Sequence, residues 1–175
     1  MKIILETPRI LLREMTPDDF GSLCTLLQDG ETMYAYEGAF SDAEVLEWLD
    51  RQRTRYARDG FGLWGMIEKE TGRFIGQAGL TLQDAGGTEE TEIGYLLNRG
   101  VWHCGYASEA AAACRDYAFQ VLGRDRVVSL IRDSNRASQR VAERIGMKKE
   151  GLFIKHFRHV DMPHFIYAVN RVTER

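Results

Sequence analysis

Residues 91–119 contain the clearest change of hydrophobic period in the chain. Residues 92–97, which end in the apolar run at 95–97, are predicted to form a strand, and a turn at 98–100 follows. From Gly105 onward small apolar residues recur with helical spacing, and the β-branched run at 125–132 predicts another strand. A strand, a helix and a second strand in this order predict a right-handed crossover between parallel strands.

The chain before this crossover predicts two helices and three strands. Helices are expected at residues 16–28 and 41–59, and strands at 10–15, 61–68 and 74–82. The second helix opens with a capping box formed by Ser41 and Glu44. Its core face is expected to consist of Val45, Leu46, Trp48 and Leu49. Residues 29–40 and 83–91 lack a clear period and are expected to be loops.

The chain after the crossover predicts one more helix, begun by Asn135 and stopped by Gly146, and two closing strands at residues 148–160 and 165–170. Antiparallel strands that lead into a parallel β-α-β unit indicate an α+β fold with helices packed on a mixed sheet. With 175 residues and no linker or repeat, residues 1–175 are expected to form a single domain.

Composition narrows the class of protein. A formal net charge of −3 gives no reason to expect a nucleic acid or an anionic membrane as partner. No apolar run approaches the roughly 18 residues that would span a bilayer, and the start of the chain lacks the pattern of a secretion signal. Cys24, Cys104 and Cys114 lack C-x-x-C spacing, so neither a disulfide framework nor a zinc site is expected. These features favour a reduced cytoplasmic protein.

The predicted helix start near Gly105 has no side-chain cap. The preceding Trp-His-Cys sequence offers no Ser, Thr, Asp or Asn, so the first backbone N–H groups lack partners at the positive end of the helix dipole. Gly105 has no Cβ and Ala107 is nearly as small, which lets a ligand approach the backbone. Free amides at an open helix start form an anion site, most often for phosphate. A packing requirement for small residues is the alternative.

Several short motifs together resemble one family. Gly105-Tyr106-Ala107 lies where GNAT N-acetyltransferases carry G-x-G/A in the loop that binds the pyrophosphate of acyl-coenzyme A. The run W-x-x-G-Y-A-S-E-A is similar to the branch with the ribosomal-protein alanine N-acetyltransferases (RimJ/RimL-like), as are LETPRILLR at residues 5–13, NRAS at 135–138 and ERIG at 143–146. The resemblance implies the GNAT fold: a mixed, mostly antiparallel sheet with one splayed parallel pair and helices packed on it.

The resemblance implies acetyl-CoA as cosubstrate, without a metal, and a primary amine as acceptor. The amides of residues 103–108 would bind the pyrophosphate, and the backbone of residues 95–97, often bulged in the family, would bind the pantetheine arm. The N–H of Leu97 would also polarise the thioester carbonyl. Cofactor-binding residues expected on this basis are Tyr95, Leu96, Leu97, His103, Cys104, Gly105, Tyr106, Ala107, Ser108, Asn135 and Ser138. Without the resemblance, residues 95–97 are ordinary core strand and Asn135 is a helix N-cap.

Glu92 is the candidate general base. An attacking ammonium must lose a proton before its nitrogen can add to the thioester, and a carboxylate accepts that proton directly or through water. A solvated glutamate at a strand end is the alternative, because Glu89 and Glu90 stand beside it. Many GNAT proteins carry a tyrosine late in the following helix as the acid for the leaving thiolate. Ala142 occupies that position here, and the resemblance assigns the role to Ser138 instead, although solvent can also help the thiolate leave.

Other charged and reactive side chains have less demanding interpretations. Arg136, Arg140 and Arg144 recur every fourth residue, which is more typical of a solvated helix face than of a contact to a coenzyme phosphate. His156, His159 and His164 predict no metal site, because the first two point to opposite faces of one strand. A nucleophilic role for Cys104 has no evident histidine partner, and the family transfers the acetyl group directly.

The resulting interpretation is an acetyl-CoA-dependent N-acetyltransferase that acts through a ternary complex on a small amine or a protein N-terminus. A non-catalytic acyl-CoA-binding or regulatory module with the same fold is the alternative, and the sequence leaves a monomer and a homodimer both open. Acidic residues at 84, 89 and 90 and the Tyr34–Glu37 segment lead us to expect a cationic acceptor. Ordinary solvated loop charges would explain the same residues.

Overall fold

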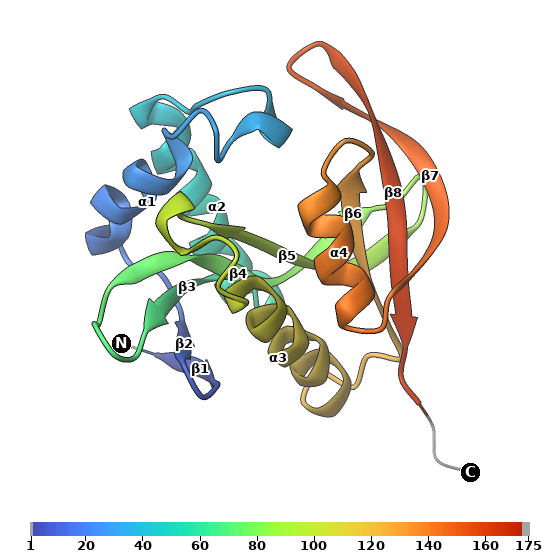
Figure 1. Ribbon diagram of the computed structural model, residues 1–175, viewed down its shortest axis with the longest axis horizontal. Helices are drawn as coiled ribbons and strands as arrows, with labels where there is room; N and C mark the ends of the chain where they lie inside the picture. Colours follow the sequence, from blue (N-terminus) through green and yellow to red (C-terminus); the bar gives the residue numbers. More distant parts are fainter. Residues whose placement is uncertain (1, 173–175) are drawn as a thin grey trace.

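In the computed structural model, which describes residues 2–172, eight strands form one sheet in the order β1-β2-β3-β4-β5-β6-β8-β7 (Figure 1). The strands are β1 (Ile3–Glu6), β2 (Ile10–Arg13), β3 (Leu63–Glu68), β4 (Phe74–Asp84), β5 (Glu89–Leu97), β6 (Arg126–Arg132), β7 (Lys148–Phe157) and β8 (Val160–Asn170). The helices are α1 (Phe20–Leu27), α2 (Asp42–Asp59), α3 (Tyr106–Gln120) and α4 (Arg136–Arg144). Neighbouring strands are antiparallel except β5 and β6, which are parallel.

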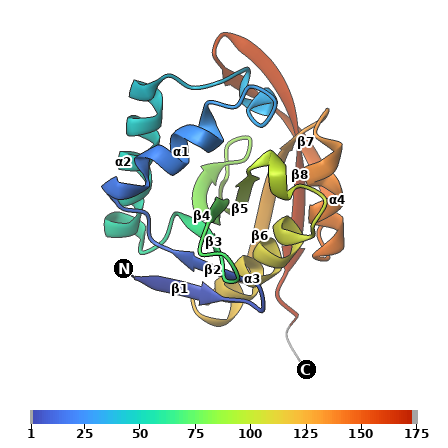
Figure 2. The ribbon, with the colours of Figure 1, turned by 60° about the vertical axis from the view of Figure 1, so that its left-hand side comes forward.

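The helices cover both faces of the sheet (Figure 2). Helices α3 and α4 pack on one face, over a cluster that includes Trp64, Ile93 and Val127. Helices α1 and α2 cover the other face, over a second cluster that includes Leu23 and Leu49. Because β5 lies between these clusters, its alternate side chains point to different helical layers. No helix within residues 2–172 is long and apolar enough to cross a membrane.

The elements expected at the centre of the chain are confirmed. The N-cap Ser41 accepts from the Glu44 N–H at 3.3 Å while its own N–H donates to the Glu44 carboxylate, and α2 ends at Gly60 with a φ of 80°. The predicted crossover from β5 through α3 to parallel β6 is present.

Several expectations from the sequence are wrong. The two closing strands were expected at residues 148–160 and 165–170, yet β7 ends at Phe157 and β8 begins at Val160, because the turn is formed by residues 158 and 159 with positive φ. Strand β1 was not expected, because its four residues are too short to show a period, yet it pairs with β2. The expected loop at residues 83–91 is mostly a hairpin, since β4 runs to Asp84 and β5 begins at Glu89 with continuous register. Leu46 is 50 % exposed rather than in the core, because it lies at the edge of the apolar stripe of α2.

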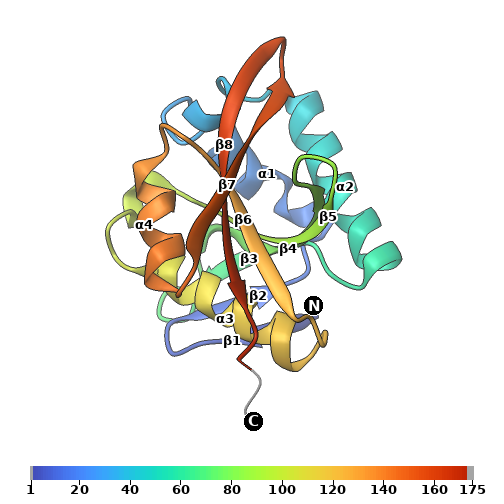
Figure 3. The same ribbon diagram turned by 90° about the vertical axis from the view of Figure 1, so that its right-hand side faces the viewer.

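The sheet opens between its two parallel strands. Pairing of β5 with β6 is recorded only between Glu92 and Val128, after which the strands diverge. The β7–β8 hairpin extends beyond this opening toward the loop before α2, as Figure 3 shows, and its Phe157 ring lies 6.4 Å from that of Tyr36. The opening is therefore walled by segments from most of the chain.

Candidate functional site at the splayed strands

A cavity of about 830 Å³ occupies the opening between β5 and β6. Its lining includes the end of β5, the start of α3 and the first turns of α4 on one side, and α2, the 34–36 turn and the β7–β8 hairpin on the other. We call the first side the coenzyme side and the second the acceptor side. Glu92 lines the cavity between the two sides, and after burial its charge contributes to raising the pKa of both Tyr95 and Tyr36.

Two side chains replace the ladder hydrogen bond that is lost where the strands separate. If β6 continued in register, the Leu130 N–H would donate to the Ile93 carbonyl. Instead the Leu130 N–H donates to Oε1 of Glu92 at 3.3 Å, and Oγ of Ser129 donates to the Ile93 carbonyl at 2.9 Å. The Glu92 side chain is thus held by the backbone of β6, the strand that diverges from β5. Sequence reasoning missed Ser129, whose role depends on the splay.

The position of Glu92 perturbs its acidity. It is half-buried, and Oγ1 of Thr81 donates a second hydrogen bond to it at 3.3 Å. Burial raises the pKa of the Glu92 carboxyl above its ordinary value, and Lys155, the Leu130 N–H, Thr81 and Arg55 only partly oppose this effect. A carboxylate with a raised pKa in a cavity is a better proton acceptor than a solvated one.

Backbone groups of β5 face the coenzyme side. The Asn98 N–H donates to the Ile75 carbonyl at 2.9 Å, which fixes the alternation of the β4–β5 ladder. By this alternation the N–H of Leu96 points toward β4, and those of Tyr95 and Leu97 point toward the gap. The Leu96 N–H therefore does not face the expected pantetheine position, although the residue lines the cavity.

The end of β5 leaves one donor for a ligand. The indole N–H of Trp102 donates to the Leu97 carbonyl at 2.8 Å, so this carbonyl is satisfied, while β6 is too far to accept from the Leu97 N–H. The bulge often found at this strand in the family is absent, since the β4–β5 register continues without a shift. Divergence of β6 alone exposes the donor.

The start of α3 forms a cradle of free amides. Among residues 2–172, no acceptor is recorded for the backbone N–H groups of residues 103–108, and the helix has no side-chain cap. His103 and Gly105 have left-handed φ angles of 63° and 83°, and such alternation turns successive amides toward one point. Oγ of Ser108 is buried without a partner and lines the cavity. Cys104 does not line the cavity, and its Sγ lies 3.5 Å from the Trp102 carbonyl.

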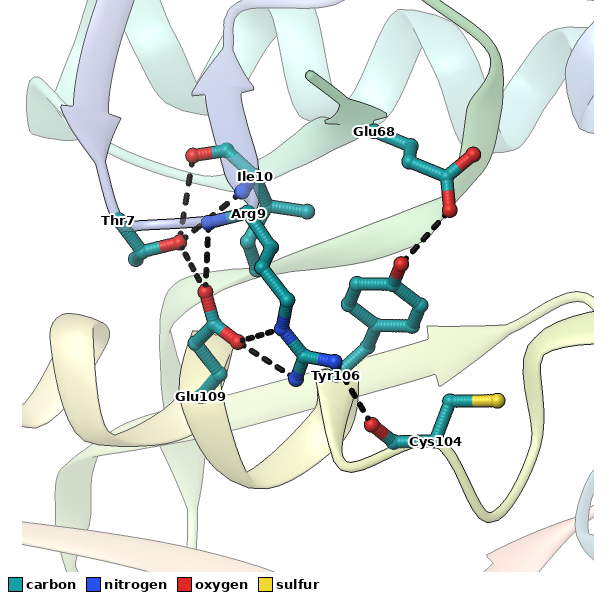
Figure 4. Close-up of polar contacts among 7 residues, drawn as sticks. All are labelled: Thr7, Arg9, Ile10, Glu68, Cys104, Tyr106 and Glu109. Carbon is teal, nitrogen blue, oxygen red and sulfur yellow. Dashed lines mark hydrogen bonds and ion pairs between the residues drawn. The ribbon is translucent and has the colours of Figure 1, made fainter. Parts of the chain in front are cut away.

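An ionic network joins this cradle to the β1–β2 turn (Figure 4). The Arg9 guanidinium donates from Nε to Glu109 at 2.7 Å and from Nη1 to the Cys104 carbonyl at 3.0 Å. Glu109 also accepts from the Arg9 N–H at 3.0 Å and from Oγ1 of Thr7 at 2.6 Å. The TPR and GYASE motifs, about 100 residues apart, are therefore two halves of one structure, which the sequence alone did not reveal.

Tyr106 extends the network to the sheet. Arg9 lies over its ring, 4.3 Å from the centroid, and its hydroxyl donates to Oε1 of Glu68 at 2.6 Å. Hydrogen bonds from Thr71, Tyr106 and Arg73 hold the pKa of Glu68 at about 2, so this acceptor is ionised at neutral pH. The hydrogen bond between Tyr106 and the ionised Glu68 thereby fixes the loop of free amides to β3.

Helix α4 supplies the remaining coenzyme-side residues. Oδ1 of Asn135 accepts from the Ser138 N–H at 3.1 Å, so Asn135 is the N-cap, and both residues line the cavity. The Tyr95 hydroxyl donates to the Ser138 carbonyl at 2.9 Å and ties β5 to α4 across the opening. Ala142 is fully buried in the core, so this position presents no acid to the cavity. Of the arginine stripe, Arg140 and Arg144 line the cavity and Arg136 does not.

The acceptor side has aromatic walls and basic side chains. The aromatic lining consists of Tyr34, Tyr36, Phe40, Trp48 and Phe157. The basic lining consists of Arg51, Arg55, Arg132, Lys155 and Arg158, with His164 beside them. Glu89, Glu90 and Asp84 do not line the cavity, because the β4–β5 hairpin carries them past it. The structure therefore removes the acidic hairpin from the basis on which a cationic acceptor was expected, whereas Tyr34 and Tyr36 do line the cavity. Within residues 2–172 no cluster of potential metal ligands is found.

Comparison with known proteins agrees with this geometry. A sequence profile of the acetyltransferase (GNAT) domain matches residues 9–148. The uncharacterised protein YkkB of Bacillus subtilis is 40% identical over 147 residues, which cover 83% of this chain and 86% of YkkB. An acetyltransferase structure from Agrobacterium tumefaciens has a TM-score of 0.80 at 28% identity and covers 98% of this chain and 95% of its own.

A structure of RimL, a ribosomal L7/L12 alpha-N-protein acetyltransferase in complex with coenzyme A, has a TM-score of 0.78 at 18% identity, with coverage of 97% of this chain and 98% of that one. At this identity the likeness shows the fold alone. The splayed parallel pair and the profile match over most of the chain together lead to one conclusion. The chain belongs to the GNAT family and is an acetyl-CoA-dependent acetyltransferase.

Proposed function

We propose that the protein transfers the acetyl group of acetyl-CoA directly to the nitrogen of a primary amine, with both substrates bound in one ternary complex. The observation that carries this proposal is the position of Glu92, a carboxylate with a raised pKa at the junction of the coenzyme and acceptor sides. From there it can take the proton of an amine on one side while the thioester lies on the other.

The coenzyme side fits the pyrophosphate and the pantetheine arm. The free amides of residues 103–108 and the unpartnered Ser108 hydroxyl suit phosphate oxygens, and Gly105 leaves room for them. Arg140 and Arg144, without a carboxylate partner among the described residues, would add charge complementarity. The exposed backbone of Tyr95 and the Asn135 side chain would bind the amide groups of the arm.

In this mechanism the chain positions the reactants and stabilises developing charge. The Leu97 N–H would donate to the thioester oxygen as the amine nitrogen bonds to the carbonyl carbon, which is worth about 3 kcal/mol in comparable oxyanion sites. The carbon–sulfur bond then breaks, the sulfur keeps its electron pair, and the second proton of the attacking nitrogen passes through Ser138 or solvent to the thiolate. Glu92 holds the proton taken from the amine until it passes to water.

Two measurements test the proposal. Release of free coenzyme A should require an amine, and the mass of the amine product should show one acetyl group in place of one hydrogen. Intact-mass analysis after incubation with acetyl-CoA alone should show no acetylated protein, because transfer is direct. A stable acetyl group on Cys104 that is passed on to amines would overturn the ternary mechanism.

A further inference from the structure

Most cations on the acceptor side are neutralised by a neighbouring carboxylate. Arg51 pairs with Glu47 at 3.1 Å, Arg132 with Glu37 at 2.5 Å, and Arg158 with Glu44 at 2.5 Å. Arg55 and Lys155 line the same cavity, but no carboxylate within residues 2–172 lies within 4.0 Å of either. These two side chains are therefore the uncompensated positive charges of the acceptor side.

Arg55 is held in place without a counter-ion. Its Nη1 donates to Oε1 of Gln52 at 3.2 Å, and the same buried amide oxygen accepts from the Leu63 N–H at 3.1 Å. Burial, followed by the nearby charge of Arg51, lowers the pKa of the half-buried Arg55. A guanidinium has five N–H donors, and only one is used here by a described residue. The others are available to an anionic ligand.

Lys155 approaches from the opposite wall. Lys155 lies two residues before Phe157 on β7, so the two side chains point to the same face of the strand. The Phe157 ring packs against Tyr36, and this face therefore closes the acceptor side. Figure 2 shows α2 and β7 on either side of the end of β5. Burial has the largest effect on the pKa of Glu92 and raises it; the charge of Lys155 has the next largest effect and lowers it, and Arg55 lowers it as well. Both cations thus lie within electrostatic reach of the proposed base.

The charge balance disfavours a purely cationic acceptor. Glu92 is one carboxylate near two uncompensated cations, of which Arg55 is half-buried and Lys155 exposed, and a polyamine would add more positive charge beside them. An acceptor that carries its own anion would neutralise one or both cations while its amine lies at Glu92. We propose that Arg55 and Lys155 select acceptors that carry a carboxylate or phosphate group in addition to the primary amine, an inference that rests on the amine acetylation proposed above.

Matched pairs of amines test this selection directly. Coenzyme A release would be compared for β-alanine and β-alaninamide, for O-phosphoethanolamine and ethanolamine, and for acidic and neutral peptides with free N-termini, beside spermidine. The expected result is a preference of about tenfold or more in kcat/KM for the anionic member of a pair, which decreases as salt is added. The pairs also show whether the anion belongs to a small molecule or to a peptide.

Variants assign the preference to the two side chains. Arg55→Met and Lys155→Met should each reduce the ratio of kcat/KM for the anionic amine to kcat/KM for its neutral partner about tenfold, a ratio in which any change in the basicity of Glu92 cancels. Arg53→Met, an exposed residue of α2 that pairs with Asp50, and Lys148→Met on β7 are the matched controls and should change neither value. Retained preference in the Arg55→Met, Lys155→Met double variant would overturn the inference.

The outcomes separate this inference from the proposed function. If kcat/KM of the wild type for ethanolamine or spermidine equals kcat/KM for the anionic amines, transfer to amines stands and selection by Arg55 and Lys155 is wrong. If no amine in the panel releases coenzyme A, the amine acetylation is not supported, and calorimetry with the coenzyme A complex decides the inference alone. Binding of O-phosphoethanolamine but not ethanolamine, lost in the double variant, supports the anion site; equal or absent binding of both contradicts it.

Discussion

The two sides of the cavity are built in different ways. The coenzyme side depends on backbone groups that lie close together in sequence, namely the end of β5 and the six amides before and within the first turn of α3. The acceptor side depends on side chains from α2, β5, β7, β8 and the turn at 34–36. The backbone part of the coenzyme side is local, with side chains of α4 added to it, whereas the acceptor side is assembled entirely by the fold.

This difference explains what each side can specify. A cradle of amides recognises phosphate whatever else the molecule carries, so it suits a cosubstrate shared by many enzymes. Side chains such as Arg55 and Lys155 can change without disturbing the sheet, so the acceptor can differ between proteins that share the fold. Substitutions that act on one side only would sharpen this distinction.

The largest effect is expected at the junction of the two sides. Glu92→Gln keeps the shape and the acceptor for the Leu130 N–H but cannot take a proton, so kcat should fall by about 10²-fold near neutral pH. The deficit should shrink at high pH, where the amine is already neutral. A pH–rate profile measures both, with Glu90→Gln as control, since Glu90 pairs with Arg126 outside the cavity. An unchanged profile in Glu92→Gln would assign the base to another group or to water.

The next effect belongs to the coenzyme side alone. Gly105→Ala adds a Cβ at a φ of 83°, 3.4 Å from Nη2 of Arg9 and beside the free amides, and should weaken acetyl-CoA binding about tenfold. Gly72→Ala has a similar φ of 71° and open space around its Cβ, so it carries the same backbone strain, about 1 kcal/mol, away from the cavity. Calorimetry and thermal unfolding of both variants separate binding from strain. Equal affinity in the two would mean that no phosphate passes Gly105.

The local side is also the side that sequence could predict. The strand, the uncapped helix start and the small residues at 105 and 107 stand in one continuous segment, so their chemistry can be read without knowing the fold. The mixed sheet followed from the same segment, because a β-α-β crossover requires a parallel pair. The placement of Cys104 was not predictable because it depends on the backbone dihedral angles of the loop before α3. The direction of the Leu96 N–H was not predictable because it depends on which residues of β5 form hydrogen bonds with β4.

The acceptor side could not be predicted for a physical reason. Asp84, Glu89 and Glu90 are adjacent to Glu92 in sequence, yet a long hairpin carries them away. Lys155, 63 positions later, reaches the cavity because β7 and β8 fold over it. Charges near a site in sequence are a poor guide when the wall is made by strands far along the chain.

A smaller effect is expected from the network that links the two motifs of the coenzyme side. Arg9→Lys keeps the charge, but one ammonium cannot replace the two-atom contact with Glu109 and the bond to the Cys104 carbonyl. We expect KM for acetyl-CoA to rise about threefold to fivefold with kcat nearly unchanged, because Arg9 positions the loop and does not touch the reacting atoms. Arg53→Lys is the surface control. A fall in kcat at saturating acetyl-CoA would show that Arg9 does more than position.

The smallest effect is on stability and again concerns Glu92. Because its pKa is higher in the folded than in the unfolded protein, the folded state binds more protons between the ordinary carboxyl pKa and the raised one. Unfolding free energy contributed by this group therefore falls as pH rises through that interval and stays constant above it. Glu92→Gln removes the titration, so the variant should be more stable than wild type at neutral pH and should lose the advantage at acidic pH. Urea unfolding at several pH values measures the difference. A constant difference across the interval would show that ionisation of Glu92 does not destabilise the folded protein. The proposed base would then have no cost in unfolding free energy.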